Sequence, residues 1–216
     1  MGSYIVNVLG FKFTDKWWSS SSNERRALMK RACDAVERLG KNKDVEKAAL
    51  YSSLRYDTDI ISWVMTENPD DITLFRATME KIFGDKSMLR YGFLSVYEPR
   101  NIGYTRSRKV SLPYFVAYPM SKSPDWYLLS EKEKSGIMSE HIRVATTHKD
   151  NRGIKSYTTQ SFGIDDNEFL VLYEVPSIEG WMHVTQDLRG VQARKWITND
   201  RPILVGRLGG FGPFLI

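Results

Sequence analysis

Apolar and polar positions along the chain follow two successive series of the same kind. In the first series the apolar residues alternate as in strands or recur at helical spacing, with Gly40 and Pro69 as breaks. The pattern predicts a strand, a helix, two strands, a helix and a strand, over residues 4–13, 23–39, 48–55, 59–66, 72–82 and 91–97. This β-α-β-β-α-β order is that of a ferredoxin-like, split-βαβ unit.

The second half repeats this order, over residues 114–118, 130–141, 156–162, 168–173, 177–188 and 203–205. Ser22 and Ser130 each precede a helix at a spacing of 108 residues, and this register pairs His141 with Cys33. Packing the two sheets face to face covers the open face of each. The predicted fold is therefore α+β, with two tandem ferredoxin-like units forming a dimeric-type α+β barrel within one chain. We place the units in residues 1–98 and 112–216, joined by a linker, 99–111.

The composition limits the class of protein. With 216 residues, 42% of them apolar, the chain can bury a substantial core. No apolar run approaches the roughly 18 residues of a membrane span, and the first residues lack the features of a secretory signal, so we expect a cytoplasmic protein. The net charge of +5 comes from scattered Lys and Arg without a nucleic-acid-binding motif, which favours a solvated surface or an acidic small ligand over nucleic acid. The single cysteine, Cys33, excludes an intrachain disulfide.

The segment 118–122, Tyr-Pro-Met-Ser-Lys, places a phenol, a thioether and an ammonium within five residues. Proline has no N–H to donate to a strand ladder, so we expect Pro119 to end the strand and leave Tyr118 and Met120 facing the inside of the barrel. Tyr118 could equally be a packed strand tyrosine, and Trp126 a core tryptophan. Because the segment has no counterpart in the first unit, it is a candidate for function.

The three histidines differ in their surroundings. His148 lies in a polar stretch typical of a surface loop, and His183 has no titratable neighbour in the sequence. His141 follows Ile137 and Met138 on a helix face that we expect to be buried, either as a satisfied core residue or as a ligand to a metal or haem iron. No second histidine or cysteine stands at the spacing of a zinc site.

Together these segments resemble the chlorite dismutase-like family of haem proteins, and within it the coproheme decarboxylase branch. The resemblance runs over nearly all 216 residues. Its most specific parts are residues 118–122, Trp126-Tyr127, His141 and the run Ser-Phe-Gly-Ile-Asp-Asp at 161–166 with Glu168; further parts are residues 90–97 and 191–194.

The resemblance implies a role for each residue. His141 would be the proximal iron ligand, and Tyr118 the redox-active tyrosine that attacks a propionate, with Lys122 as its proton or charge partner. Met120 would line the porphyrin pocket, and Trp126 would pack on the proximal side. The cofactor would be an iron porphyrin (coproheme or haem b) and the oxidant peroxide. The reaction would convert two propionates of iron coproporphyrin III to the vinyl groups of haem b. Members of the family usually form cyclic pentamers, so a homo-oligomer is expected.

Some positions depart from the family pattern. Counting back from Gly163, Ser156 stands where chlorite-degrading members carry arginine and decarboxylases often carry glutamine. Serine supplies no charge for an anionic oxychlorine intermediate, which disfavours chlorite dismutation unless Lys155 or Arg152 moves in to supply that charge. Gly190 stands where many members carry a carboxylate that accepts the proximal imidazole N–H, a contact that Asp187 could replace. The linker is shorter than in relatives, and Arg108 within it is our candidate for binding a propionate.

Three functions follow from this reading. The first is a coproheme decarboxylase-like enzyme, which depends on Tyr118, Lys122 and His141 together. The second is a haem-binding protein with weak peroxidase activity or a sensing or carrier role, which Ser156 and Gly190 favour. The third is an α+β-barrel scaffold that binds no haem.

Overall fold

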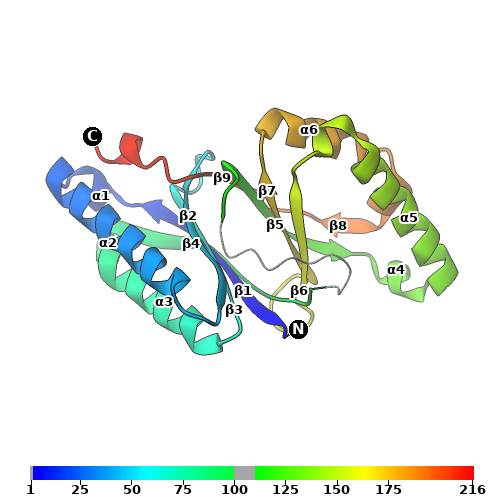
Figure 1. Cartoon of the computed structure of the whole chain (residues 1–216), viewed down its shortest axis with the longest axis horizontal. Coiled ribbons are helices and arrows are strands. Elements are labelled where there is room, and N and C mark those ends of the chain that lie inside the picture. The colour runs from blue at the N-terminus through cyan, green and yellow to red at the C-terminus, as the bar shows by residue number, and fades with distance from the viewer. Residues whose placement is uncertain (1, 100–109) are drawn as a thin grey trace.

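The computed structural model describes residues 2–99 and 110–216 (Figure 1). The first unit contains strands β1 (Tyr4–Phe13), β2 (Val45–Ser53), β3 (Ile60–Thr66) and β4 (Ser87–Tyr97), with helices α1 (Asp15–Trp18), α2 (Ser22–Gly40) and α3 (Pro69–Phe83). The second contains β5 (Tyr114–Lys122), β6 (Lys155–Gln160), β7 (Phe169–Val175), β8 (Ile197–Asn199) and β9 (Leu204–Leu208), with α4 (Pro124–Leu128), α5 (Glu131–Thr147) and α6 (Ile178–Asp187). Within these described ranges, no helix has the length and apolarity needed to cross a membrane.

The strands form a closed antiparallel barrel, as the sequence predicts. The order β4-β1-β3-β2 in the first unit and β6-β7-β5-β9 in the second is ferredoxin-like in each case. The two units join where β2 pairs with β9 and where β4 pairs with β6. The short strand β8 pairs with the last residues of β5. Gly206 permits the first junction, because a Cβ there would lie 2.6 Å from the Cβ of Tyr51. The helices lie on the outside, α2 and α3 at one end of the molecule and α5 and α6 at the other (Figure 1).

Side chains from both units fill the inside of the barrel. Alternate residues along each strand point inward, and they form one hydrophobic cluster that includes Tyr51, Trp63, Phe115, Tyr157 and Leu172. The rings of Tyr51 and Trp63 stack on Phe115, with centroids 4.7 and 5.1 Å away. A second cluster lies between the outer face of the first unit's sheet and helices α2 and α3.

The structure corrects the register of the internal repeat. The residues that cap α2 and α5 are Ser21 and Ser130, whose hydroxyl oxygens accept the backbone N–H of Glu24 and Glu133. The two units therefore match at a spacing of 109 residues, not 108. The counterpart of His141 is therefore Ala32. The pairing with Cys33 that we expected from the sequence is wrong.

The expectation that Pro119 ends its strand is also wrong. Strand β5 continues to Lys122, with Pro119 opposite Leu170 and Met120 opposite Phe169 on β7. Pairing with β9 on the other side ends at Ala117, so the proline stands where only one neighbour is paired. Phe115 and Ala117 point into the barrel. Tyr118 and Met120 therefore point outward, toward the helices, and not into the barrel as we expected.

One ion pair is buried between the two units inside the barrel. Lys47 on β2 is 2% exposed and Glu174 on β7 is 0% exposed, with 3.4 Å between Nζ and Oε1. Glu174 also accepts the hydroxyl of Tyr157 at 2.8 Å.

Replacing Lys47 by Met should leave a buried carboxylate with less compensation and lower the free energy of unfolding by about 3 kcal/mol. Chemical denaturation measures this. Lys41→Met is the matched control, since Lys41 pairs with Glu37 in solvent, where ion pairs contribute at most about 1 kcal/mol. Adding Glu174→Gln to Lys47→Met should recover much of the loss. Equal effects of the two lysine substitutions would contradict the assignment.

Candidate functional site

The outer face of the second unit is open where that of the first unit is filled. Four core residues of the first unit, Leu9, Phe11, Ala32 and Val64, correspond at the spacing of 109 to Tyr118, Met120, His141 and Tyr173. The first four are 0–2% exposed, whereas all four counterparts are partly exposed. In the part of the chain that the structure describes, no third hydrophobic cluster lies between α5, α6 and the sheet.

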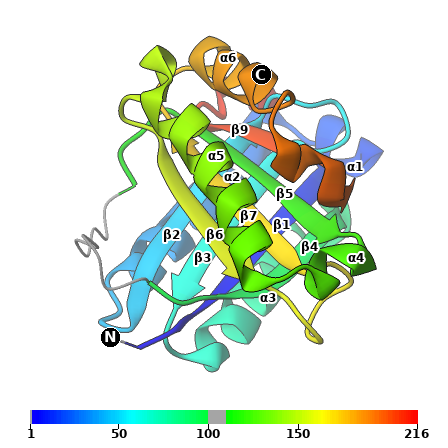
Figure 2. The same ribbon diagram turned by 90° about the vertical axis from the view of Figure 1, so that its right-hand side faces the viewer.

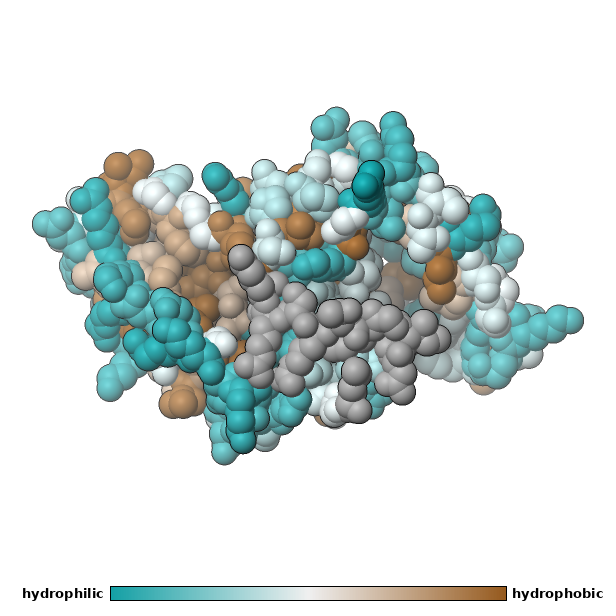
Figure 3. Space-filling model, in the orientation of Figure 1, coloured by the Kyte–Doolittle hydropathy of each residue, from teal (hydrophilic) through white to brown (hydrophobic). Residues whose placement is uncertain are grey.

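Helix α5 is likewise incompletely covered by the rest of the protein. It lies across β5, β6 and β7 (Figure 2), yet none of its 17 residues is buried. Its inward stripe includes Ile137, Met138, His141 and Val144, all only partly covered. In Figure 3 the surface is hollowed beside this helix, with apolar atoms visible among polar ones. The partly covered apolar stripe of this helix is therefore available to pack against a further apolar group.

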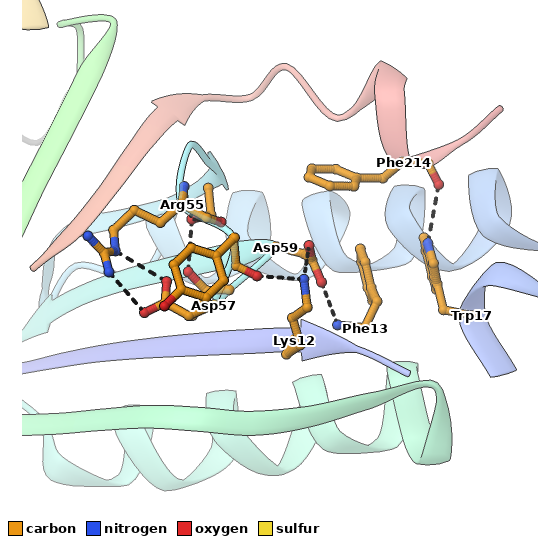
Figure 4. A network of polar contacts seen from close by, with 10 residues as sticks. Lys12, Phe13, Trp17, Arg55, Asp57, Asp59 and Phe214 are labelled. Atoms are coloured by element: carbon orange, nitrogen blue, oxygen red, sulfur yellow. Dashed lines mark hydrogen bonds and ion pairs between the residues drawn. The ribbon is translucent and has the colours of Figure 1, made fainter. Parts of the chain in front are cut away.

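The end of β5 carries a cation where the first unit carries an aromatic ring. In the first unit Phe13 stacks on Trp17 at 3.9 Å, and its backbone N–H donates to Asp59 Oδ2 at 2.7 Å (Figure 4). The counterparts at the spacing of 109 are Lys122, Trp126 and Glu168.

Their geometry keeps the same framework. The Lys122 backbone N–H donates to Glu168 Oε2 at 2.8 Å, and the Tyr127 hydroxyl donates to the same oxygen at 2.6 Å. The Lys122 ammonium lies 3.4 Å from the centre of the Trp126 ring. The buried Trp126 therefore holds Lys122 at the edge of the open site by a cation–π contact.

The environment lowers the pKa of both Lys122 and His141. Burial lowers the pKa of Lys122 to about 8, opposed by Glu168 and assisted by Lys134. Burial, and then the nearby Lys122, lowers the pKa of His141. Neutral imidazole is the form that binds a metal ion. Among the residues that the structure describes, no hydrogen-bond partner engages the His141 ring, and no three His, Cys, Asp or Glu side chains gather as a metal site.

The other two histidines are tied to acidic side chains. His148 Nε2 lies 3.5 Å from Asp187, so Asp187 does not replace the missing carboxylate beside His141. His148 is the residue that caps the C-terminal end of α5, and its side chain is only 12% exposed. The sequence suggested a surface loop instead. His183 Nδ1 lies 2.9 Å from Asp150, a neighbour that the sequence did not show.

Tyr118 lies beside a second tyrosine. The rings of Tyr118 and Tyr173 are 6.2 Å apart and nearly parallel, and Trp181 of α6 lies 4.1 Å from Tyr173. Burial, and then Tyr173, raises the pKa of Tyr118 well above its usual value, so its phenol is protonated at neutral pH. Ser156 stands opposite Tyr173 on β6 and lies close enough to influence its pKa.

Two arginines near Tyr118 share one carboxylate. Asp200 accepts Arg189 at 3.1 Å and Arg194 at 2.7 Å, and both Asp200 and Arg189 lie close enough to affect the pKa of Tyr118. Burial opposes ionisation of Asp200, yet the two guanidinium groups hold the pKa of this carboxyl below its usual value. This cluster places guanidinium groups, the preferred partners of carboxylates, at the edge of the open site.

The structure brings most of the predicted residues to this one face. Tyr118, Met120 and Lys122 come from β5, and Trp126, His141 and Ser156 come from α4, α5 and β6. Lys155 does not turn toward them, since its ammonium lies 3.7 Å from Glu174 inside the barrel. Arg108 lies outside the described residues. Tyr173, Arg189 and Asp200 were not predicted from the sequence, although the repeat at a spacing of 109 residues places Tyr173 at the position of Val64.

Comparisons with known proteins agree with this architecture. The sequence model of the Chlorite dismutase family matches residues 25–209. The coproheme decarboxylase of Mycolicibacterium smegmatis is 26% identical over 181 residues, which cover 76% of this chain and 74% of that protein. The crystal structure of TA0507, a chlorite dismutase-like protein, matches with a TM-score of 0.89 and 38% identity over 100% of this chain and 98% of its own.

A haem-binding protein from Thermus thermophilus matches with a TM-score of 0.82 at 17% identity, over 96% of this chain and 92% of that chain. At this identity the likeness shows the shared fold alone. The match of the family sequence model, which spans most of the chain, decides the membership. The chain belongs to the chlorite dismutase family.

Proposed function

We propose that this protein binds an iron porphyrin between α5 and the outer face of β5–β7, and that it catalyses the peroxide-dependent decarboxylation of iron coproporphyrin III to haem b. The observation that carries the proposal is the contrast between the two units. Tyr118, Met120, Tyr173 and His141 surround the space that Leu9, Phe11, Val64 and Ala32 fill in the first unit. The coproheme decarboxylase relative supports the choice of substrate.

The residues present fit an iron porphyrin. His141 offers a ring without a hydrogen-bond partner among the described residues, and its lowered pKa favours the metal-binding form. The partly covered apolar stripe of α5 and Met120 suit a flat apolar ring. When bound, the iron porphyrin supplies peroxide-driven one-electron oxidation, which no side chain here supplies alone.

The side chains of this chain would then bind, orient and exchange protons. His141 would hold the iron from α5. Tyr118, protonated because its pKa is raised, would give one electron and one proton from its phenol to the bound oxidant and recover both from the adjacent propionate, whose loss of carbon dioxide releases one further electron to that oxidant. Lys122, Arg189 and Arg194 would pair with propionate carboxylates and fix which of them approaches Tyr118.

The direct test is conversion of the substrate. The cofactor-free protein is loaded with iron coproporphyrin III, treated with peroxide, and its porphyrin is analysed by mass. We expect two successive mass losses, each of carbon dioxide and two hydrogen atoms from one propionic acid side chain, ending at haem b. Recovery of unchanged coproheme, or only ring destruction, would contradict the proposed reaction.

The ionisation of Lys122 predicts a pH dependence of binding. Below about pH 8 its ammonium is charged and attracts a propionate, and above that pH the charge is lost. The affinity for iron coproporphyrin III should therefore fall as the pH rises through about 8. Lys122→Met should remove this part of the pH dependence, whereas Lys132→Met, on the exposed side of α5, should keep it. Absorption titrations of the three proteins measure this, and parallel curves would contradict the assignment.

Haem binding with weak peroxidase activity is the second candidate. Two observations favour this function. The His141 ring lacks a carboxylate partner within the described residues. Ser156 offers a neutral hydroxyl at the position where chlorite-degrading members of the family carry a guanidinium. Without a carboxylate acceptor, imidazole is a weaker electron donor to a metal. Tight binding of coproheme or haem b without decarboxylation would select this function and would also leave chlorite dismutation disfavoured.

A further inference from the structure

Three oxidisable side chains lie side by side on the outer face of the second unit. Tyr118 stands opposite Val171, and Tyr173 stands opposite Val116, so the two tyrosines are diagonal neighbours on β5 and β7. Their rings stack at 6.2 Å with an angle of 23°. The ring of Trp181 on α6 lies 4.1 Å from that of Tyr173. Together they form a continuous aromatic row leading from the candidate site to α6.

The first unit packs the same positions without aromatic rings. At the spacing of 109, the counterparts of Tyr118, Tyr173 and Trp181 are Leu9, Val64 and Ile72. Leu9 and Val64 are buried in the core of the first unit, and Ile72 packs against it. At these three positions, a helix pair therefore packs on the sheet with aliphatic side chains alone. The aromatic row occurs in the unit that carries His141, which indicates a chemical role beyond packing.

We propose that Tyr173 is the redox partner of Tyr118, so that an oxidising equivalent placed on Tyr118 is shared with Tyr173. This inference rests on the proposed function, in which peroxide and the iron porphyrin are the oxidant that removes one electron and one proton from Tyr118. In the exchange, the Tyr173 hydroxyl loses its hydrogen as one electron and one proton. The Tyr118 oxygen gains both, so its O–H bond re-forms while that of Tyr173 breaks.

The surroundings of Tyr173 suit this exchange. Burial raises the pKa of Tyr173, opposed by Tyr118 and Ser156, so at neutral pH its phenol still carries the proton that the exchange moves. Trp181 on one side and the strand pairing of β7 with β5 and β6 fix the ring. The phenol of Tyr173 therefore stays next to that of Tyr118 without rearrangement.

Electron paramagnetic resonance tests the exchange. Protein loaded with iron coproporphyrin III is mixed with peroxide and frozen within milliseconds, with ring-deuterated tyrosine to identify tyrosyl signals. We expect Tyr118→Phe to retain a tyrosyl signal and Tyr118→Phe/Tyr173→Phe to lose it. The control Tyr114→Phe, on the same face of β5, should match the wild type.

The outcomes separate this inference from the proposed function. If the wild type decarboxylates coproheme but the single and double variants give the same tyrosyl signal, the redox partnership is wrong and the proposed function stands. If the wild type forms no tyrosyl signal and no product, both are wrong.

A measurement on the cofactor-free chain adds a readout that does not depend on turnover. One-electron photo-oxidation with ruthenium tris(bipyridine) and persulfate couples neighbouring tyrosines, and peptide mass spectrometry maps the cross-links. We expect a Tyr118–Tyr173 cross-link that Tyr173→Phe abolishes and Tyr114→Phe leaves intact. Cross-links at other tyrosines without this one would overturn the proposed proximity of the two phenols.

Discussion

Replacing His141 by alanine should weaken the binding of iron coproporphyrin III by at least about 100-fold, or roughly 3 kcal/mol. The variant removes the imidazole that the structure places without a hydrogen-bond partner in the described region, on a helix with no buried residue. Because Ala32 fills the matching position of the first unit, alanine is compatible with the backbone of this helix. The protein should therefore fold normally and lose the Soret band of a histidine-bound iron porphyrin.

The matched control for that experiment is His183→Ala. His183 Nδ1 lies 2.9 Å from Asp150 Oδ2, whereas Trp181, two residues earlier on α6, is the residue of that helix whose ring contacts Tyr173. The Soret titration of His183→Ala should match that of the wild type. If His141→Ala binds the porphyrin with an unchanged spectrum, the assignment of His141 as the iron ligand is wrong.

Replacing Tyr118 by phenylalanine should lower the rate of decarboxylation by at least roughly 1000-fold while leaving porphyrin affinity nearly unchanged. The phenol is the group that supplies the electron and the proton, whereas the ring contributes the stacking on Tyr173, which phenylalanine keeps. Single-turnover measurements with peroxide, followed by mass, separate the two quantities. Substantial conversion by Tyr118→Phe would show that Tyr118 is not the reacting tyrosine. Tyr114→Phe is the matched control.

The period of the hydrophobic pattern was sufficient to predict the fold. Strand-like alternation and helical spacing recur in the same order in both halves, and only a barrel of two packed sheets covers both open faces. The register was off by one residue for a local reason. Residues 19–22 are four consecutive serines, and each can cap a helix. Only the hydrogen bond from the Glu24 backbone to Ser21 identifies the cap.

The candidate site was predictable only in part. Alternation shows that Tyr118 and Met120 share one face of a strand, but not whether that face lies inside or outside the barrel. The inward face is settled by the long-range contacts of Phe115 with Tyr51 and Trp63, which no local pattern contains. Arg189 and Asp200 likewise meet near Tyr118 only through the tertiary fold.

The cation at the end of β5 shows how comparing the two repeated units identifies candidate functional residues. Lys122 and Phe13 occupy equivalent positions above equivalent tryptophans, with equivalent carboxylates binding their backbone N–H groups. The framework is therefore common to both units, and we propose that the exchange of a ring for an ammonium serves porphyrin binding in the second unit. The same comparison between the two units identifies four further residues that replace small or aliphatic side chains of the first unit: Tyr118, Tyr173, Trp181 and His141.

We infer above all that the second unit holds one iron porphyrin in the space that the first unit fills with its own side chains. Titration of the cofactor-free wild type with iron coproporphyrin III, followed by the Soret band, tests it most directly. We expect saturation at one porphyrin per chain, with a resonance Raman iron–histidine stretch for the reduced complex. No change in the Soret band on addition, or a spectrum without histidine ligation, would contradict it.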